Sequence, residues 1–269
     1  MLKIPRIPLG HTPDSVGLAY ESVCFPSRVD STTLKGWYLP GKRAITLIIV
    51  NGGAQNRVDS ETGTLEMSQD LVERGYNILL FDLRGRGESE GQGYHMVNLE
   101  RDLGGAVDYL KQRFPSRDIG LMGFSTGGAA AIIFASREKV AAVVSDNCFA
   151  SVTDSLTRKL AADWGVPRII VRVIIPGLFL IARMLYGYKK VDPVGRVADI
   201  SCPILFIQGD ADDLVPVSDA YRLYKASGNK LDDLWIVPNA GHTQAYHTNP
   251  AIYIERVMSF LERAEGKSD

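Results

Sequence analysis

The sequence contains few of the residues that build disulfide frameworks and metal sites. It has three cysteines, Cys24, Cys148 and Cys202, and four histidines in 269 residues, and no two cysteines form a Cys-x-x-Cys pair. Cysteines this sparse argue against a disulfide scaffold and against a zinc site, and they are typical of a reducing compartment. We therefore expect a cytoplasmic protein that needs no metal ion.

An excess of either charge is also missing. The chain has 30 basic and 31 acidic residues, and no basic run is longer than two residues. Binding to nucleic acid or to an anionic lipid surface requires a concentration of positive charge. Neither partner is therefore expected.

Long uninterrupted apolar runs are absent as well. Pro5 and Pro8 interrupt the N-terminal segment, which therefore lacks the apolar core of a signal peptide. The most hydrophobic stretch, residues 169–186, contains Arg172 and Arg183 and falls short of a membrane span. Stable membrane insertion is not predicted, although an anchor that preceded residue 1 would make the protein membrane-associated.

The most informative segment is residues 119–130, which read IGLMGFSTGGAA. Its first part is typical of a short buried strand, and its second part begins a helix of small residues. Ser125 lies at the junction, where a direct turn from strand to helix strains the backbone and crowds the residues two positions away. Glycine at 123 and 127 would remove that clash, so Ser125 is a candidate nucleophile.

The same Gly-x-Ser-x-Gly spacing occurs a second time, at residues 87–91. There it lies in a charged run of Arg, Gly and Glu, with no apolar strand before it and no helix directly after it. Because the spacing alone is weak evidence, the context decides. We interpret Ser89 as a loop residue.

The order of apolar segments predicts the fold class. Helical patterns fall between most of the apolar runs, and this alternation is typical of a doubly wound α/β fold with a mostly parallel eight-stranded sheet and helices on both faces. An antiparallel edge is expected at residues 19–26 and 33–39, and further strands at 45–51, 76–82, 119–124, 141–146, 203–209 and 234–237. Helices are expected at 65–74, 97–113, 126–136, 217–226 and 250–264.

One connection is too long for a simple crossover. A connection between parallel strands needs about a dozen residues, and the segment between residues 146 and 203 is several times longer. Apolar and amphipathic helical patterns lie within it at residues 152–164 and 169–186. We predict that residues 147–200 form an inserted helical lid in a single domain spanning residues 1–269.

A serine nucleophile needs a base, and the four histidines make the search short. His11 lies in the N-terminal tail and His95 in the loop after the charged glycine run, so both are expected at the surface. His242 follows the last predicted strand and its turn, which places it at the carboxyl edge of the sheet, where ligands bind in such folds. It is the preferred base, with His247 as the alternative.

The base in turn needs an acid to orient it. Three carboxylates, Asp210, Asp212 and Asp213, follow the strand predicted at residues 203–209. At least two of them must serve only in turns or as helix caps. The residues alone do not choose among the three, but the chain order Ser, Asp, His matches that of hydrolases.

These motifs together resemble the serine esterases of the α/β-hydrolase superfamily along nearly the whole chain. The resemblance rests on the elbow at residues 123–127, the segment DLRGRGES at 82–89, the segment GDADDLVP at 209–216, and Gly241-His242. It implies an α/β-hydrolase fold with a Ser-His-Asp triad. In relatives the acid segment usually reads Gly-x-x-Asp-x-x-Val-Pro, which implies Asp212 as the acid, with Asp213 next.

The resemblance also implies an oxyanion hole. The family usually has His-Gly after the third strand, whereas this chain has Asn51-Gly52-Gly53. The departure at Asn51 changes a side chain and not a backbone donor. The backbone amides of Gly53 and Thr126 are therefore implied as the donors that stabilise the oxyanion, with Ala54 as the alternative to Gly53.

We therefore expect a hydrolase of small-molecule carboxylic esters that uses Ser125, His242 and Asp212, forms an acyl-enzyme and needs no cofactor. The lid presents apolar residues, although such residues also serve simply to pack a lid against the core. They predict a pocket for an apolar acyl or alcohol group, lined by Leu156, Trp164, Phe179 and Met184.

Other functions fit parts of the same pattern. A thioesterase or a serine peptidase would use the same triad. Alternatives of another class are a non-catalytic binding protein with a hydrolase fold and a protein that binds lipid surfaces through residues 169–186.

Overall fold

The computed structural model describes residues 4–28, 30–93 and 99–266. These residues form one eight-stranded sheet with the strand order β1-β2-β4-β3-β5-β6-β7-β8. The strands from β4 to β8 along this order pair in parallel, whereas β1 and β2 form the antiparallel edge that the sequence predicts. Their bounds are β1 Glu21–Pro26, β2 Thr33–Leu39, β3 Ile45–Val50, β4 Asn77–Phe81, β5 Asp118–Phe124, β6 Ala142–Asp146, β7 Ile204–Gly209 and β8 Asp233–Val237.

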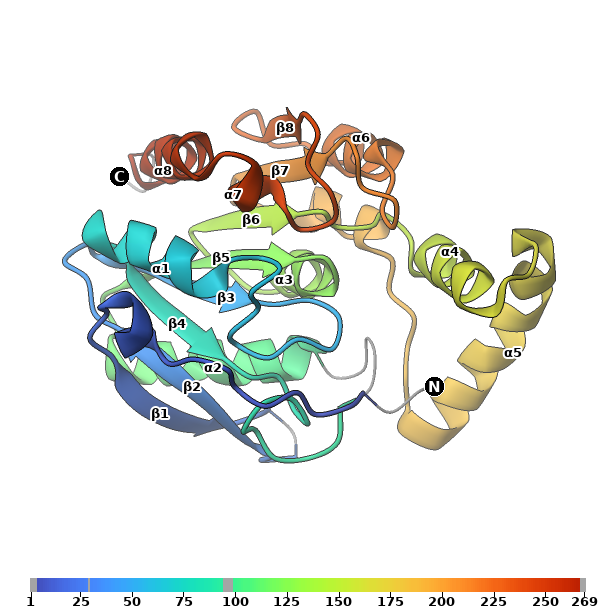
Figure 1. Ribbon diagram of the computed structural model, residues 1–269, viewed down its shortest axis with the longest axis horizontal. Coiled ribbons are helices and arrows are strands. Elements are labelled where there is room, and N and C mark those ends of the chain that lie inside the picture. The colour runs from blue at the N-terminus through green and yellow to red at the C-terminus, as the bar shows by residue number, and fades with distance from the viewer. Residues whose placement is uncertain (1–3, 29, 94–98, 267–269) are drawn as a thin grey trace.

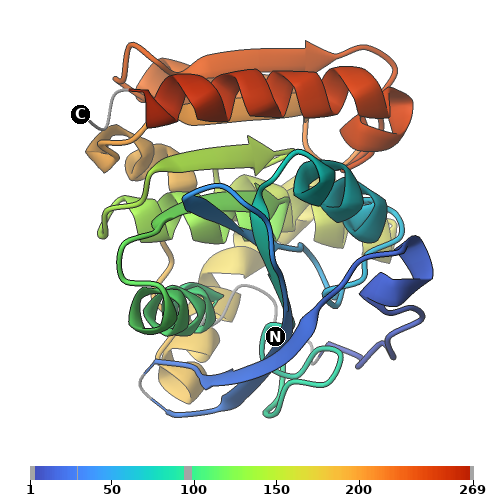
Figure 2. The same ribbon diagram turned by 90° about the vertical axis from the view of Figure 1, so that its left-hand side faces the viewer.

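Helices cover both faces of the sheet. Helices α2, α3 and α6 pack on one face, and α1 and α8 pack on the other, as the two views in Figure 1 and Figure 2 show. The predicted α/β-hydrolase fold, a mostly parallel eight-stranded sheet with helices on both faces, is thus confirmed. The helices are α1 Thr64–Glu73, α2 Leu99–Arg113, α3 Thr126–Ala135, α4 Val152–Trp164, α5 Arg168–Tyr186, α6 Val217–Ala226, α7 Ala245–Thr248 and α8 Pro250–Glu265.

The central strands are apolar because both of their faces are covered. Every residue of β3, β4, β6 and β7 is buried. Alternate side chains of each strand contribute to two separate cores, one on each face. Continuous burial explains why the sequence shows unbroken apolar runs here and not a polar alternation.

The short helix α7 is an element that the sequence patterns did not predict. It is four residues long and follows His242, and a segment this short shows little helical periodicity. His11 is exposed, as expected. His95 and the first two residues of the helix predicted at 97–113 lie outside the described residues.

Helices α4 and α5 form an insertion between β6 and β7. They lie beyond the carboxyl ends of the parallel strands, at the right of Figure 1. In the described part of the chain no single helix is long and apolar enough to cross a membrane. The pair α4 and α5 reaches that length and hydropathy only when taken together, and it is bent by 119°.

Candidate active site

Ser125 occupies the strained turn between β5 and α3. Its backbone angles are φ 52° and ψ −115°, in a region that side-chain-bearing residues rarely adopt. A Cβ atom on Gly127 would lie 1.9 Å from the Val50 carbonyl oxygen, and one on Gly123 would lie 2.4 Å from the Gly127 carbonyl oxygen. Both glycines are therefore required by close approach, which is the reason that the sequence indicated.

The structure brings His242 and Asp212 together. His242 Nδ1 lies 2.7 Å from Asp212 Oδ2, and their side chains are 20% and 0% exposed. The alternatives lie elsewhere: Asp213 is exposed, and His247 Nε2 lies 3.0 Å from the carbonyl oxygen of Ser60. Of the candidate acids and bases, Asp212 and His242 therefore form the pair.

The Asp212 carboxylate is held by several donors. Its Oδ1 accepts from the backbone amides of Leu214 and Val215, both at 2.8 Å. Its Oδ2 accepts from the side-chain amides of Asn147 and Gln208 as well as from His242. Burial raises the pKa of Asp212, but these hydrogen bonds and the charge of His242 outweigh burial and lower the pKa below its usual value. The carboxylate is therefore ionised and fixed in orientation.

Ser125 and the His242–Asp212 pair lie at the same edge of the sheet. Ser125 follows β5, Asp212 follows β7 and His242 follows β8, each at the carboxyl end of its strand. Among the described residues no hydrogen bond joins the Ser125 hydroxyl to His242. Such bonds are often long in substrate-free enzymes and tighten when substrate binds.

Two backbone segments meet beside Ser125. A Cβ on Gly52 would lie 2.9 Å from Ser125 Cβ, so the loop after β3 touches the elbow. The amide of Gly53 donates to Thr126 Oγ1 at 2.8 Å. The Asn51 side chain supports this loop by donating to the Asn56 carbonyl oxygen at 2.8 Å. The two backbone amides implied as oxyanion donors thus lie on adjoining segments, and the Gly53 amide is hydrogen-bonded to the hydroxyl of Thr126.

Ser89 has a structural environment. Its buried hydroxyl donates to the Asp82 carbonyl oxygen at 2.6 Å and accepts from the Lys35 amide at 2.9 Å. The Asp82 carboxylate pairs with buried Arg57 at 3.0 Å. These bonds fix the loop after β4 and leave Ser89 no base, which agrees with its interpretation as a loop residue.

Asp146 is a buried carboxylate that the sequence patterns did not single out. It is the last residue of β6, its carbonyl oxygen accepts from the Ser125 amide at 2.8 Å, and its Oδ2 accepts from the Tyr253 hydroxyl at 2.9 Å. Burial raises its pKa to about 7, although the Tyr253 hydrogen bond and His242 oppose this shift. The sequence feature that could have identified it is an acidic residue at the end of an apolar strand.

The four predicted pocket residues do not line the cavity beside the elbow. Leu156 and Phe179 are partly buried against the core, whereas Trp164 is 49% and Met184 is 77% exposed. A cavity of about 630 Å³ lies instead beside Thr126 and one face of α3, and none of the four lines it. Helical periodicity identifies the apolar side of a helix, but it does not tell whether that side faces the core or the surface.

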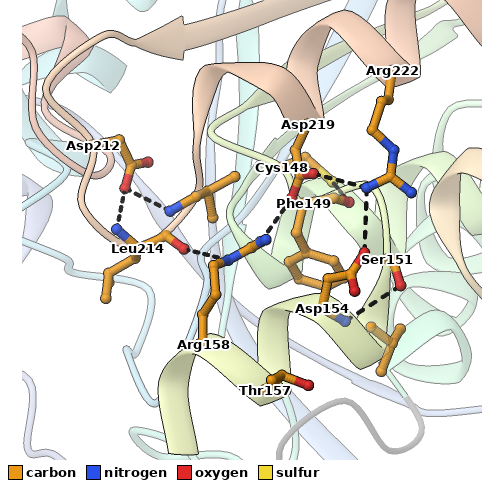
Figure 3. Close-up of polar contacts among 12 residues, drawn as sticks. Cys148, Phe149, Ser151, Asp154, Thr157, Arg158, Asp212, Leu214, Asp219 and Arg222 are labelled. Carbon is orange, nitrogen blue, oxygen red and sulfur yellow. Dashed lines mark hydrogen bonds and ion pairs between the residues drawn. The ribbon is translucent and has the colours of Figure 1, made fainter. Parts of the chain in front are cut away.

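Ion pairs anchor the insertion to α6, and a hydrogen bond joins it to the loop that carries Asp212. Arg158 of α4 pairs with buried Asp219 of α6 at 2.7 Å, and it donates to the Leu214 carbonyl oxygen at 3.1 Å (Figure 3). Arg222 contacts Asp154 at 3.3 Å. Because the Leu214 amide also donates to Asp212, helix α4 and Asp212 are connected through one residue. In the described ranges no group of three or more His, Cys, Asp or Glu side chains could hold a metal ion.

A serine on a strained strand-to-helix turn, with a His–Asp pair following later strands, defines the class of α/β-hydrolases. Comparisons agree. A family model described as "Serine aminopeptidase, S33" matches residues 44–171. The uncharacterized protein YqkD of Bacillus subtilis (strain 168) is 30% identical over 243 residues, which cover 88% of this chain and 77% of YqkD. The chain belongs to the serine esterase-like hydrolases of the α/β-hydrolase superfamily.

Other relatives and solved structures extend this likeness. The "Alpha/beta hydrolase domain-containing protein WAV2" of Arabidopsis thaliana is 25% identical over 265 residues, which cover 94% of this chain and 82% of WAV2. The esterase Pf2001 of Pyrococcus furiosus superimposes with a TM-score of 0.81 at 26% identity, covering 98% of both chains. The α/β hydrolase GrgF of Penicillium sp. sh18 shares the fold, with a TM-score of 0.72 at 20% identity, covering 92% of this chain and 99% of GrgF.

Proposed function

We propose that this hydrolase cleaves small-molecule carboxylic esters, with Ser125 as the nucleophile, His242 as the base and Asp212 as the acid. The observation that carries the proposal is the 2.7 Å contact between His242 and fully buried Asp212, at the sheet edge that also presents the strained Ser125. An acid that holds one ring nitrogen leaves the other free to accept the serine proton.

The roles follow from this geometry. Because Nδ1 donates to Asp212, Nε2 of His242 is the basic nitrogen, and it takes the Ser125 proton as the hydroxyl attacks the ester carbonyl carbon. The oxyanion that forms accepts from the amides of Gly53 and Thr126, and the Gly53 amide leaves the Thr126 hydroxyl to do so. His242 then protonates the alcohol that departs, and a water molecule, activated by His242, releases the acid from Ser125.

We propose esters as the substrates, and not thioesters or peptides, because the esterase Pf2001 resembles this chain along 98% of its length. A thioesterase and a serine peptidase would need the same three residues. In this proposal α4 and α5 act as a lid, because they lie beyond the carboxyl ends of the strands that carry the triad. Arg158 ties that lid to the acid loop.

Serine labelling tests the nucleophile. The wild-type protein and Ser89→Ala should hydrolyse p-nitrophenyl acetate and react with a fluorophosphonate probe, whereas Ser125→Ala should do neither. Peptide mapping of the labelled protein should locate the probe on Ser125. Label on another residue, or full activity of Ser125→Ala, would refute the assignment. Parallel assays with matched thioesters and amides decide the bond that is cleaved.

A further inference from the structure

The cavity beside the elbow extends along α3, and we call it the channel. Thr126, Ala130 and Ile133 line it at intervals of three or four residues, so they lie along one face of the helix, and Arg137 lines it two residues beyond the last residue of α3. The ten residues of α3 span roughly 15 Å at 1.5 Å per residue. The channel therefore extends from Thr126, the residue next to Ser125, past the far end of α3.

The walls of this channel combine apolar and basic residues. Its apolar part includes Ala129, Ala130, Ile133 and Phe134 of α3. Basic side chains from four separate parts of the chain also line it. The basic residues that line the cavity are Arg28, Arg101, Arg137, Lys189, Lys190 and Arg196, against the acidic residues Glu100 and Glu138.

Half of these cations already have carboxylate partners. Arg28 pairs with Asp108 at 2.6 Å and also with Glu138, so one of the two acidic lining residues is already paired with a cation. Lys190 pairs with Asp192 at 3.0 Å, and Arg196 pairs with Asp199 at 3.4 Å.

The other three basic residues have no such partner. In residues 4–28, 30–93 and 99–266, no carboxylate forms an ion pair with Arg101, Arg137 or Lys189. Against them only Glu100 remains as an acidic lining residue without an ion pair among the same residues. A chain whose net charge is −1 therefore concentrates uncompensated positive charge in the lining of one cavity.

We propose that this channel is the acyl subsite and that it takes an apolar chain ending in an anionic group, a carboxylate or a phosphate. The inference rests on the proposed function, because Thr126, which lines the channel, directly follows Ser125 in the chain. The apolar walls would bury the methylene chain. The cations without ion-pair partners, of which Arg137 lies beyond the far end of α3, would hold the terminal anion, since charge-assisted hydrogen bonds from Arg and Lys favour carboxylate and phosphate oxygens.

Matched ester pairs test this inference. The mono-p-nitrophenyl esters of suberate and sebacate carry a terminal carboxylate, whereas p-nitrophenyl octanoate and decanoate have the same acyl chain lengths without it. A terminal phosphate in place of the carboxylate forms a second arm that identifies which anion is preferred. The anionic esters should have a kcat/KM about tenfold higher than the neutral ones at low salt, a ratio that falls as potassium chloride screens the cations.

Variants locate the effect. The ratio of anionic to neutral kcat/KM should fall toward one in the double variant Arg137→Gln, Lys189→Gln. Lys225→Gln removes an exposed cation on α6, outside the channel, and should leave the ratio unchanged. A wild-type ratio of one, or an equal loss in Lys225→Gln, would overturn the inference.

The outcomes separate this inference from the function on which it rests. If neutral esters are cleaved in a Ser125-dependent manner without any anionic preference, the esterase proposal stands and the anionic subsite is refuted. If no ester is cleaved, the esterase proposal fails, and calorimetry of monomethyl suberate with Ser125→Ala decides the subsite. Binding that the double variant loses supports an anion-binding channel, and absence of binding overturns it.

Discussion

Replacing Asp212 with asparagine should abolish most of the activity while leaving the fold intact. Oδ1 of Asp212 accepts from two backbone amides, Leu214 and Val215, and the amide oxygen of asparagine can take over both bonds. The amide nitrogen then occupies the position of Oδ2, where it faces three donors, namely Asn147, Gln208 and His242. A donor opposite His242 Nδ1 favours the tautomer with the proton on Nε2, which cannot accept the proton of Ser125.

The expected loss is large because tautomer and charge change together. A buried triad aspartate replaced by asparagine lowers kcat by about 10⁴-fold, which corresponds to about 5.5 kcal/mol of transition-state stabilisation. Replacing a carboxylate in a solvated position would lower kcat much less. The Asp212 side chain is 0% exposed, so we expect the large loss.

The assay is kcat for p-nitrophenyl acetate, measured alongside thermal unfolding followed by circular dichroism. Asp213→Asn is the matched control, because Asp213 is the adjacent, exposed residue and its replacement should leave kcat within about twofold. A loss of less than tenfold in Asp212→Asn, or a greater loss in Asp213→Asn, would show that Asp212 does not orient the base.

Four further changes probe the surroundings of the site. Gly127→Ala should destabilise the protein by more than about 3 kcal/mol in denaturant titrations, because the new Cβ would lie 1.9 Å from a carbonyl oxygen, whereas Gly228→Ala, in open space, should not. Thr126→Val should raise kcat about fivefold, because the Gly53 amide no longer has to leave the Thr126 hydroxyl before it binds the oxyanion, whereas Thr126→Ser keeps this acceptor and should leave kcat near the wild-type value. Arg158→Leu should cost about 2 kcal/mol of stability because Asp219 is buried. The wild type should lose about 4 kcal/mol of stability as the pH rises from about 4 to 7, measured by unfolding at several pH values, and Asp146→Asn should abolish this loss.

Much of the fold and of the site follows from local sequence. The parallel strands are predictable because a strand buried on both faces must be apolar throughout, as in Ile45–Val50. The elbow is predictable because only glycine fits at 123 and 127. Asp212 required more, since Asp210, Asp212 and Asp213 are chemically alike and only the family spacing distinguished them before the His242 contact was seen.

Other features depend on contacts that no local pattern records. The bond from the Gly53 amide to Thr126 Oγ1 joins the loop after β3 to the first residue of α3, 73 residues away. Which face of α5 is exposed depends on how the insertion packs. For this reason Met184, which was predicted to line a pocket, is exposed at the surface. The basic lining of the cavity combines Arg101, Arg137 and Lys189, which lie far apart in sequence and come to one cavity only in the folded chain.

Two carboxylates near His242 have opposite pKa shifts, and the number of donors explains the difference. Both are buried, which by itself raises the pKa of each. Asp212 accepts from five donors and its pKa is lowered, so it contributes stability that is lost only as the pH falls through its folded pKa.

Asp146 has one side-chain donor, the Tyr253 hydroxyl, and its Oδ1 has no partner among the described residues. Its pKa of about 7 lies above the unfolded value of 3.8, so the folded state binds the extra proton and stability falls as the pH rises toward 7. Below about pH 7 the site thus holds one fixed negative charge beside His242, at Asp212. The second carboxylate is protonated over much of the acidic range, which spares His242 a competing anion.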